Sequence, residues 1–478
     1  MTSERPQCPH HKKCGGCQLQ NLSYPQQLEH KQKTVIRLLG GFCHVEPIIG
    51  MKYPYNYRNK VQAAFGTDRS GRIISGVYQS NSHRIVPVDR CMIEDRAADQ
   101  IIVTIRQMLR SFKISAYNEA TGRGFLRHVL VKRGFKTGQI MVVLVTAVPA
   151  FPSKRNFLRV LLEQHPEITT VVQNINTADT NLILGPRQTV LYGSGYIEDE
   201  LCACRFRISP KSFYQINPIQ TQVLYNKAMD FARISPRDRV IDAYCGIGTI
   251  GLVAARRGAG EVIGVELNPD AVKDARNNAR LNGQKNITFY TGDAGQFMEA
   301  MAKEGRRCDV LFMDPPRAGS SETFLSAALT LAPGRIVYIS CNPETLARDL
   351  KFLTASGAYA VKAIQPVDMF PFTEHVETVC LLSKLSEAKH HISVQVDMDE
   401  LDLTAAESKA TYEEIQDWVQ EKYGFHVSHL NIAQVKRKHG IIERENYNKP
   451  KSPDSKQPRC PEEKVKAIET ALRFFQMI

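Results

Sequence analysis

The stretch from Val240 to Gly251 constrains the fold of this chain more than any other. It reads VIDAYCGIGTIG, so a short apolar, β-branched run passes directly into a glycine-rich turn, and a helix-forming segment follows. Glycines in such a turn let backbone N–H groups approach a ligand at the N-terminus of the helix. The stretch therefore predicts the first strand, turn and helix of a nucleotide-binding α/β domain.

A carboxylate follows this turn at the spacing of a ribose-binding group. The run 261–265 reads as a second strand and ends at Glu266, about twenty residues beyond Gly246. By itself this pattern fits a binder of NAD as well as a binder of S-adenosylmethionine. An NAD-dependent oxidoreductase is thus a rival interpretation from another enzyme class.

Length and charge limit the remaining possibilities. A chain of 478 residues is too long for one ordinary domain. Its formal net charge of +13 favours a polyanionic partner such as RNA. The longest apolar run, 140–151, is too short to span a membrane, and no apolar leader precedes it. We therefore expect a cytoplasmic protein that binds RNA, with no membrane and no DNA as partner.

Cysteines near the N-terminus have the spacing of metal ligands. A loop rich in glycine and lysine has the pattern C-x5-C-x2-C, formed by Cys8, Cys14 and Cys17. Three thiolates on one loop can face one metal centre, and Cys43 and Cys91 are the next candidates for a fourth ligand. Zinc held with one of the two adjacent histidines is the alternative.

The region 45–205 has the pattern of a mostly antiparallel sheet. Alternating runs at 61–65, 73–78, 125–132, 140–145 and 170–175 are separated by turns, with a helix expected over 97–109. One of these strands carries a row of cations: Arg123, Arg127, His128, Lys132 and Arg133. The row is either a track for RNA or a solvated face. The segment 53–60 (YPYNYRNK) interleaves aromatics with cations and could stack bases.

Strands and helices alternate after residue 206. Apolar runs at 240–243, 261–265, 287–290, 310–313 and 335–339 are each followed by a helical segment. This alternation is typical of a doubly wound parallel sheet, whose ligands bind where the strands end. Polar residues follow these strands: Asp293 could accept from an adenine amino group, Asp314 follows the fourth strand, and Cys341 follows the fifth. Glu377 lies in a last strand that begins at His375 and runs to Leu382.

A cysteine and a carboxylate at this edge are typical of methyl transfer to a pyrimidine carbon. C5 of uracil is a poor nucleophile until a thiolate adds to C6, and a base must later remove the C5 proton. Cys341 is the candidate nucleophile, because the following Asn-Pro starts a helix whose dipole lowers a thiol pKa. Glu377 is the candidate base. The alternative for Cys341 is a small core residue, as we expect for Cys245 and Cys380.

Five motifs together resemble one family. The segments SFYQINP, DAYCGIGTIGL, DPPRAG, SCNPETLARDL and HVETVCLL closely resemble the RNA uridine-5-methyltransferases, over residues 1–385. The resemblance implies that Cys341 attacks uracil C6 and that Glu377 takes the C5 proton. It also implies contacts with S-adenosylmethionine from Gln215, Tyr244, Glu266 and Asp314, to which the strand-end residues Gly246 and Asp293 are added.

The cysteine spacing resembles the cluster-bearing branch of that family. This resemblance implies a [4Fe–4S] cluster held by Cys8, Cys14, Cys17 and Cys91. The branch acts mainly on 23S ribosomal RNA, so this RNA is the expected substrate and tRNA is the alternative. The N-terminal β-barrel of several members is expected to be absent, and the segment 386–478 is appended to the family core.

The expected fold class is α/β in a defined order. A cluster-binding region (1–92) overlaps a mostly antiparallel, β-rich (α+β) RNA-binding domain (45–205). A Rossmann-like doubly wound methyltransferase domain (206–385) and a small helical C-terminal extension of unknown role (386–478) follow. The target uridine is expected in a loop or single strand, where a base is cheaper to unstack.

Overall fold

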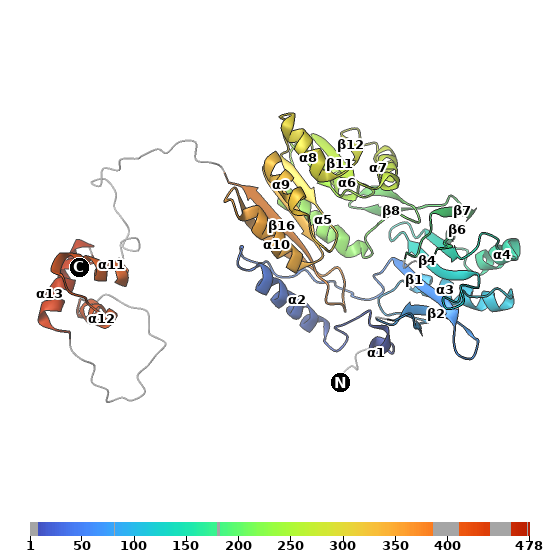
Figure 1. The fold of residues 1–478 in the computed structure, drawn as a ribbon, viewed down its shortest axis with the longest axis horizontal. Coiled ribbons are helices and arrows are strands. Elements are labelled where there is room, and N and C mark those ends of the chain that lie inside the picture. The colour runs from blue at the N-terminus through green and yellow to red at the C-terminus, as the bar shows by residue number, and fades with distance from the viewer. Residues whose placement is uncertain (1–7, 81, 179–181, 386–410, 440–459, 476) are drawn as a thin grey trace. The chain divides into compact units, whose positions relative to one another are not determined.

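The computed structural model describes residues 8–80, 82–178, 182–385, 411–439, 460–475 and 477–478. The chain divides into two compact units, residues 1–387 and residues 388–478 (Figure 1). None of the helices in the described ranges is both long and apolar enough to cross a membrane.

The first sheet of the larger unit has seven strands in the order β3-β2-β1-β4-β5-β6-β7. All neighbours are antiparallel except β5 and β6, as the alternating pattern predicted. Two helices, α3 (Arg96–Ser111) and α4 (Lys154–Gln164), pack on one face. The strands are β1 (Lys60–Thr67), β2 (Ile73–Tyr78), β3 (Ile85–Pro87), β4 (Leu126–Arg133), β5 (Ile140–Thr146), β6 (Ile168–Ile175) and β7 (Arg187–Tyr192).

Of the five cations that the sequence placed on one strand, four lie on β4 and Arg123 precedes it, and both sequence-based interpretations are wrong for three of the five. Arg127, His128 and Lys132 are buried. β4 lies in the middle of the sheet, with the α3 core on one face and a core shared with the second sheet on the other. Lys132 Nζ donates to the carbonyls of Ser209 and Ser212, 2.8 Å away in each case. This cation therefore fixes the chain that leads into the SFYQINP motif.

The second sheet also has seven strands, in the order β12-β11-β10-β13-β14-β16-β15. Its first five strands are parallel, as predicted, and β16 lies antiparallel between β14 and β15. This inserted strand departs from the order 3-2-1-4-5-6 of dinucleotide-binding sheets. The strands are β10 (Arg239–Ala243), β11 (Glu261–Glu266), β12 (Ile287–Thr291), β13 (Val310–Met313), β14 (Arg335–Ser340), β15 (Tyr359–Val367) and β16 (Glu377–Lys384).

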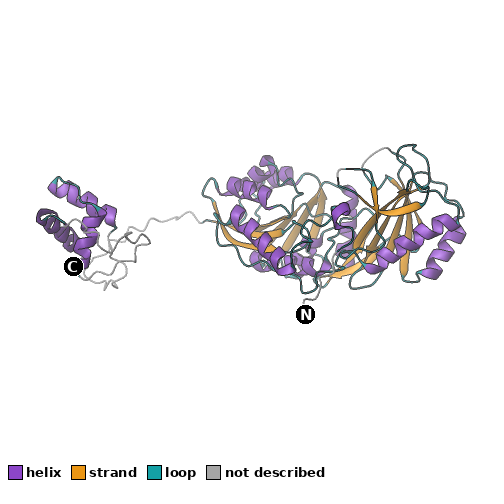
Figure 2. Cartoon of the chain, turned by 90° about the horizontal axis from the view of Figure 1, so that it is seen from below, coloured by secondary structure: helices purple, strands orange, loops and turns teal. Residues whose placement is uncertain are grey.

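Helices cover both faces of this second sheet (Figure 2). Alternate residues of β10 show the two layers, because Val240 belongs to one core and Ile241 to the other. One layer holds α5 (Pro218–Ala232), α6 (Thr249–Arg256) and α7 (Pro269–Leu281), with the ribbon β8 (Ile197–Leu201) and β9 (Cys204–Ile208). The other holds α8 (Ala294–Lys303), α9 (Glu322–Leu331), α10 (Pro343–Thr354) and the N-terminal α2 (Tyr24–Leu39).

The smaller unit is helical, as the sequence predicted for this extension. Its described elements are α11 (Tyr412–Tyr423), α12 (His429–Lys438) and α13 (Glu462–Phe474). They pack around a core of their own that includes Ile415, Ile432 and Ile468. The first two helices begin with capping boxes, at Thr411 and Ser428.

Candidate active site

Two glycines of the turn after β10 differ in what surrounds them. Gly248 precedes α6 with φ +83°, and a Cβ there would lie 2.7 Å from the Phe289 ring. Only glycine fits at this position. At Gly246, with φ +54°, an added Cβ would meet no atom within 4 Å. The space above Gly246 is therefore open at the edge where such folds bind their ligands.

Glu266 ends β11 beside this turn, where the sequence placed a ribose-binding carboxylate. One carboxylate oxygen accepts from the Gly246 N–H at 3.0 Å, and the other accepts from the Asn268 N–H at 2.9 Å. These bonds fix the carboxylate against the turn. Two further lone pairs remain on its oxygens for a ligand.

Asp242 belongs to the site although the sequence reasoning missed it. Its side chain is fully buried, and one oxygen accepts from the Gly251 N–H at 2.7 Å. The other oxygen, Oδ1, is buried and has no hydrogen-bond partner in the described part of the chain. Burial raises the pKa of Asp242 to about 8. The available signal was an acid inside an otherwise apolar strand, immediately before a glycine-rich turn.

Tyr244 and Asp293 lie close together at the same edge. The Tyr244 backbone has φ +63°, and its ring packs on Phe324 with centroids 4.9 Å apart. Burial raises the pKa of Tyr244, and the nearby Asp293 carboxylate raises it further. Asp293 caps α8 by accepting from the Gln296 N–H at 2.9 Å. Two of the predicted cofactor residues are thus brought together by different strand ends.

The SFYQINP motif leads into α5. Gln215 is buried, and Asn217 caps the helix by accepting from the Gln220 N–H. The Asn217 amide also donates to the Met369 carbonyl at 2.9 Å. This bond ties the motif to the loop between β15 and β16.

Cys341, Glu377 and Asp314 meet because of the strand order. Ser340 of β14 pairs with Thr378 of β16, and the two strands run antiparallel. The residue after Ser340 and the residue before Thr378 are therefore neighbours. Asp314 follows β13, the next strand in the sheet, so all three predicted side chains gather at the ligand edge.

The Cys341 thiol differs from the expectation in its acidity. Burial and the Glu377 carboxylate raise the pKa of Cys341 to about 11, and the guanidinium of Arg317 opposes this rise. The sequence predicted a lowered pKa from the dipole of α10. That prediction was wrong for the protein without substrate, because desolvation and a neighbouring acid outweigh the helix dipole.

The two carboxylates of the site lie close together, with Glu377 buried and Asp314 half-buried. Burial raises the pKa of Asp314 and of Glu377, and Asp314 raises that of Glu377 further. Arg317 again acts in the opposite direction on Glu377. The pair therefore retains a proton at pH values where exposed carboxylates have lost theirs.

Helix α10 holds the DPPRAG loop in place. The buried carboxylate of Asp349 accepts from the Ser320 N–H at 2.8 Å and from the Tyr338 hydroxyl at 2.6 Å. The Thr345 hydroxyl donates to the Arg317 carbonyl at 3.3 Å. The cation beside Cys341 therefore projects from a loop whose backbone is fixed on two sides.

Comparison with known proteins shows which family this chain is similar to. The family described as tRNA (Uracil-5-)-methyltransferase matches residues 169–385. An uncharacterized RNA methyltransferase of Halalkalibacterium halodurans is 46% identical over 380 residues, which cover 78% of this chain and 82% of that protein. One from Oceanobacillus iheyensis is 46% identical over 388 residues, or 80% and 83% of the two chains.

The chain belongs to the RNA uracil-5-methyltransferase family. It is an S-adenosylmethionine-dependent RNA methyltransferase, as the motifs predicted, and the rival interpretation as an NAD-dependent oxidoreductase was wrong. Among solved structures, the tRNA (uracil-54, C5)-methyltransferase of Pyrococcus abyssi with S-adenosyl-L-homocysteine is similar, with a TM-score of 0.64 and 30% identity. The match covers 77% of this chain and 85% of the archaeal one, so the Rossmann-like fold class is confirmed.

The N-terminal cysteines of this uracil-5-methyltransferase lie close enough to affect one another. Burial raises the pKa of the Cys17 thiol to about 11, and Cys14 and Cys8 lie close enough to raise it further. Cys17 and Cys91 pack against one apolar cluster around Tyr57. Within the described ranges, no three His, Cys, Asp or Glu side chains form a set arranged to hold a metal ion.

Two buried donors lie beside the cysteines. Arg58 Nε has no hydrogen-bond partner among the described residues, whereas the Gln20 side chain hydrogen-bonds the Cys17 thiol. Both side chains act on Cys17 and lower its pKa, against the larger effect of burial. Buried donors are rarely left unpaired in proteins, and such donors next to thiols fit a buried anionic group.

Proposed function

We propose that this enzyme methylates C5 of an RNA uracil through a covalent adduct between Cys341 and C6, with Glu377 as the base. The observation that carries the proposal is the register of β14 and β16. It makes Cys341 and Glu377 neighbours at the ligand edge, beside Asp314 and Arg317. A nucleophile and a base side by side are what pyrimidine C5 alkylation requires.

The steps follow from these side chains. The Cys341 thiolate forms a bond to C6, and the electron pair of the C5–C6 double bond moves onto C5 and the O4 enolate. C5 would then bond the methyl carbon of S-adenosylmethionine, whose sulfur–methyl bond breaks so that S-adenosylhomocysteine leaves with the electron pair. Glu377 takes the C5 proton, the C5–C6 double bond forms again, and the C6–sulfur bond breaks to return the thiolate.

Charges around the nucleophile support this sequence. Arg317 lowers the pKa of both Cys341 and Glu377, so it favours the thiolate and the carboxylate that the steps need. Burial acts against it and keeps Glu377 more basic than an exposed carboxylate. A base whose pKa lies closer to neutral removes a carbon-bound proton more effectively.

The chain has the groups needed to hold S-adenosylmethionine. The unpaired oxygen of Asp242 fits the ammonium group of the methionine moiety, since a buried acceptor without a donor is unfavourable. The open space above Gly246 fits the cofactor backbone, and the fixed carboxylate of Glu266 fits the ribose hydroxyls. We assign the remaining contacts to Gln215, Tyr244, Asp293 and Asp314.

We also assign a [4Fe–4S] cluster to Cys8, Cys14, Cys17 and Cys91. The thiol donor set fits such a cluster, and Arg58 supplies an unpaired buried donor for its negative charge, with the Gln20 amide already bound to the Cys17 thiol. The proposed chemistry needs no electron transfer, so the cluster is structural and braces the RNA-binding domain (45–205). Zinc is the alternative that metal analysis distinguishes.

The tyrosines of the YPYNYRNK segment differ in their availability to RNA. Tyr53 is 60% exposed, and it lines a hollow of about 650 Å³ together with Tyr55, Arg90 and Arg96. Tyr57 is buried, so it does not serve in base stacking. The hollow lies beside the cysteine loop, since Cys91 and His10 also line it, and its two aromatic rings and two cations fit an unstacked nucleotide of the RNA.

The preferred substrate is a loop or single-stranded uridine of 23S ribosomal RNA, because the cysteine loop resembles the branch that acts on it. The archaeal structure is named for uracil-54 of tRNA, which makes tRNA the second candidate. Mass-spectrometric mapping of 5-methyluridine in both RNA fractions, from strains with and without this gene, tests the choice. We expect loss from 23S ribosomal RNA alone, and loss from tRNA alone would contradict it.

A further inference from the structure

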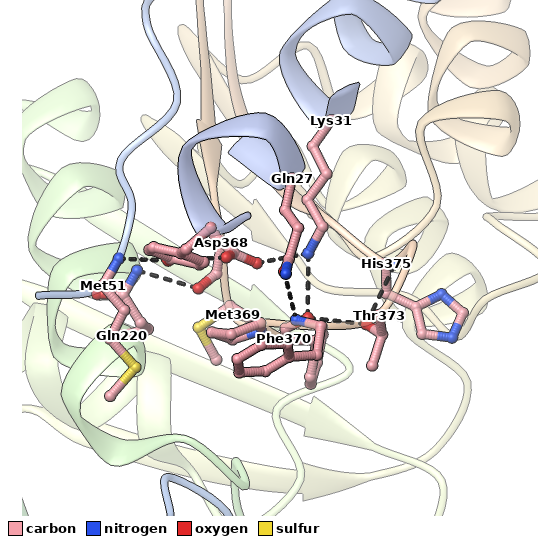
Figure 3. Close-up of polar contacts among 12 residues, drawn as sticks. Gln27, Lys31, Met51, Gln220, Asp368, Met369, Phe370, Thr373 and His375 are labelled. Atoms are coloured by element: carbon pink, nitrogen blue, oxygen red, sulfur yellow. Dashed lines mark hydrogen bonds and ion pairs between the residues drawn. The ribbon is translucent and has the colours of Figure 1, made fainter. Parts of the chain in front are cut away.

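The loop between β15 and β16, residues 368–376, leads directly into Glu377 at the ligand edge. Most of its fixed contacts come from outside the methyltransferase sheet, as Figure 3 shows. Helix α2, the segment 45–51 and helix α5 all bind it. The N-terminal helix lies more than three hundred residues away in sequence, as the separation of 337 between Lys31 and Asp368 shows.

Every polar group of Asp368, backbone and side chain, is engaged. Its carboxylate accepts from Lys31 Nζ at 2.6 Å and from the Tyr24 hydroxyl at 2.9 Å. Its N–H donates to the Ile49 carbonyl at 2.9 Å, and its carbonyl accepts from the Gln220 amide at 3.1 Å. The side chains of Lys31 and Asp368 are both 0% exposed. The residue is thus fixed from three elements at once.

The same face of α2 holds the rest of the loop. Lys31 Nζ also donates to the Phe370 carbonyl at 3.0 Å. One turn earlier, the Gln27 side-chain oxygen accepts from the Phe372 N–H at 2.8 Å. Phe372 has φ +70°, a conformation that non-glycine residues adopt only when the surroundings impose it.

The sheet register connects Asp368 to the proposed base. Val367 of β15 pairs with Glu377 of β16, so Asp368 directly follows the cross-strand partner of Glu377. On its other side, Glu377 neighbours Cys341. If Asp368 moves, its neighbour Val367 moves with it, and the pairing of Val367 with Glu377 transmits that movement to the Glu377 carboxylate.

We propose that Lys31 and Asp368, supported by Tyr24, are positioning residues that set the Glu377 carboxylate for removal of the C5 proton. This inference rests on the proposed function. A buried ion pair contributes little net stability relative to an apolar pair, because desolvation offsets the attraction. Its use here is geometric, since it fixes one conformation of the loop that carries the base.

The test measures which step becomes slow. RNA carrying uridine deuterated at C5 is compared with ordinary RNA in Tyr24→Phe, Lys31→Met and wild-type enzyme. We expect turnover to fall about ten- to hundredfold in the variants, as for a small misplacement of a catalytic group. We also expect a larger deuterium isotope effect than in wild type, because proton removal becomes rate-limiting. Affinity for S-adenosylhomocysteine stays unchanged.

Lys33→Met is the matched control, since Lys33 lies on the same helix and its side chain is 73% exposed. It should match wild type in rate and in isotope effect. If Lys31→Met does not fold, Tyr24→Phe decides, because it removes only one hydroxyl. Folded variants with normal turnover, or with slow turnover and an unchanged isotope effect, overturn the inference. Wild-type enzyme that forms no Cys341 adduct would instead overturn the proposed function.

Discussion

The two cysteine-bearing regions of this protein differ in how far the backbone alone assembles them. At the ligand edge, Cys341, Glu377 and Asp314 follow or begin adjacent strands, so the sheet register brings them together without any ligand. In the N-terminal region, Cys17 and Cys91 share an apolar cluster, but the described residues contain no set of three arranged as metal ligands. The strand-end site is therefore preformed, whereas the thiol loop would need the proposed metal centre to complete its geometry.

The charges around the two sets of thiols follow the same contrast. Cys341 has a nearby cation, Arg317, that counters the effect of burial on its pKa. Near Cys17, the Arg58 Nε donor has no partner among the described residues. At the ligand edge, a cation favours the Cys341 thiolate. In the N-terminal region, a buried donor is available to an anionic group.

The largest effect is expected at the nucleophile. Cys341→Ala should reduce methyl transfer by about 10³-fold or more, because without the sulfur C5 is not activated. Incorporation of labelled methyl groups into RNA measures this loss. Cys202→Ala, at a half-buried cysteine on the β8–β9 ribbon, is the control and should keep its activity. If folded Cys341→Ala were as active as wild type, Cys341 would not be the nucleophile, and the contrast between the strand-end site and the N-terminal cysteine loop would fail.

Glu377→Gln should reduce turnover by about 10²- to 10⁴-fold, the usual contribution of a general base. Formation of the adduct and methyl transfer precede the step that Glu377 performs. The variant should therefore accumulate a covalent complex with ordinary RNA, visible as a slowly migrating band on a denaturing gel. A slow variant that shows no such band would assign another role to this carboxylate.

In the cysteine loop, Cys91→Ser should lower iron from about four atoms per chain to near zero after anaerobic purification. We expect methyl transfer to fall only about tenfold, because the proposed cluster would brace the RNA-binding domain and take no part in the chemistry. Cys43→Ser is the control, since Cys43 lies outside the assigned set, and it should retain its iron. Stoichiometric zinc in the wild type, or full iron in Cys91→Ser, would contradict the cluster.

The smallest effect concerns the pH dependence of the rate. Arg317 lowers the pKa of Glu377 and of Cys341, and the reaction needs both groups deprotonated. Arg317→Met should raise both pKa values. The acidic limb of the pH–rate profile should therefore move to higher pH by about one pH unit. Arg280→Met, at an exposed arginine of α7, should leave the limb in place. If the acidic limb of Arg317→Met moved to lower pH, Arg317 would raise these pKa values and the assignment would be wrong.

Sequence patterns predicted the features that depend only on the order of residues within one segment. The strand before Gly246, the helix after Asn342 and the gathering of Asp314 and Cys341 at one edge all follow from strand–helix alternation. Such patterns encode which face and which end of a strand a residue occupies.

Contacts between distant segments could not be predicted in the same way. Lysine side chains are mostly exposed in proteins, yet Lys31 is buried against Asp368. Lys132 read as part of a cationic row, yet it binds two carbonyls inside a shared core. Burial of a charge is decided by which surfaces pack together, and periodicity within one segment carries no information on that. Asp242 was missed for a related reason, since its unpaired oxygen is visible only in the folded chain.

Trapping with 5-fluorouridine RNA tests the central claim most directly. Fluorine at C5 leaves Glu377 no proton to remove, so the methylated adduct cannot break down. We predict a stable complex in the presence of S-adenosylmethionine, with the RNA attached at Cys341 by peptide mass analysis, and no complex in Cys341→Ala. An enzyme that methylates ordinary RNA but forms no adduct, or forms it at another residue, would contradict the account.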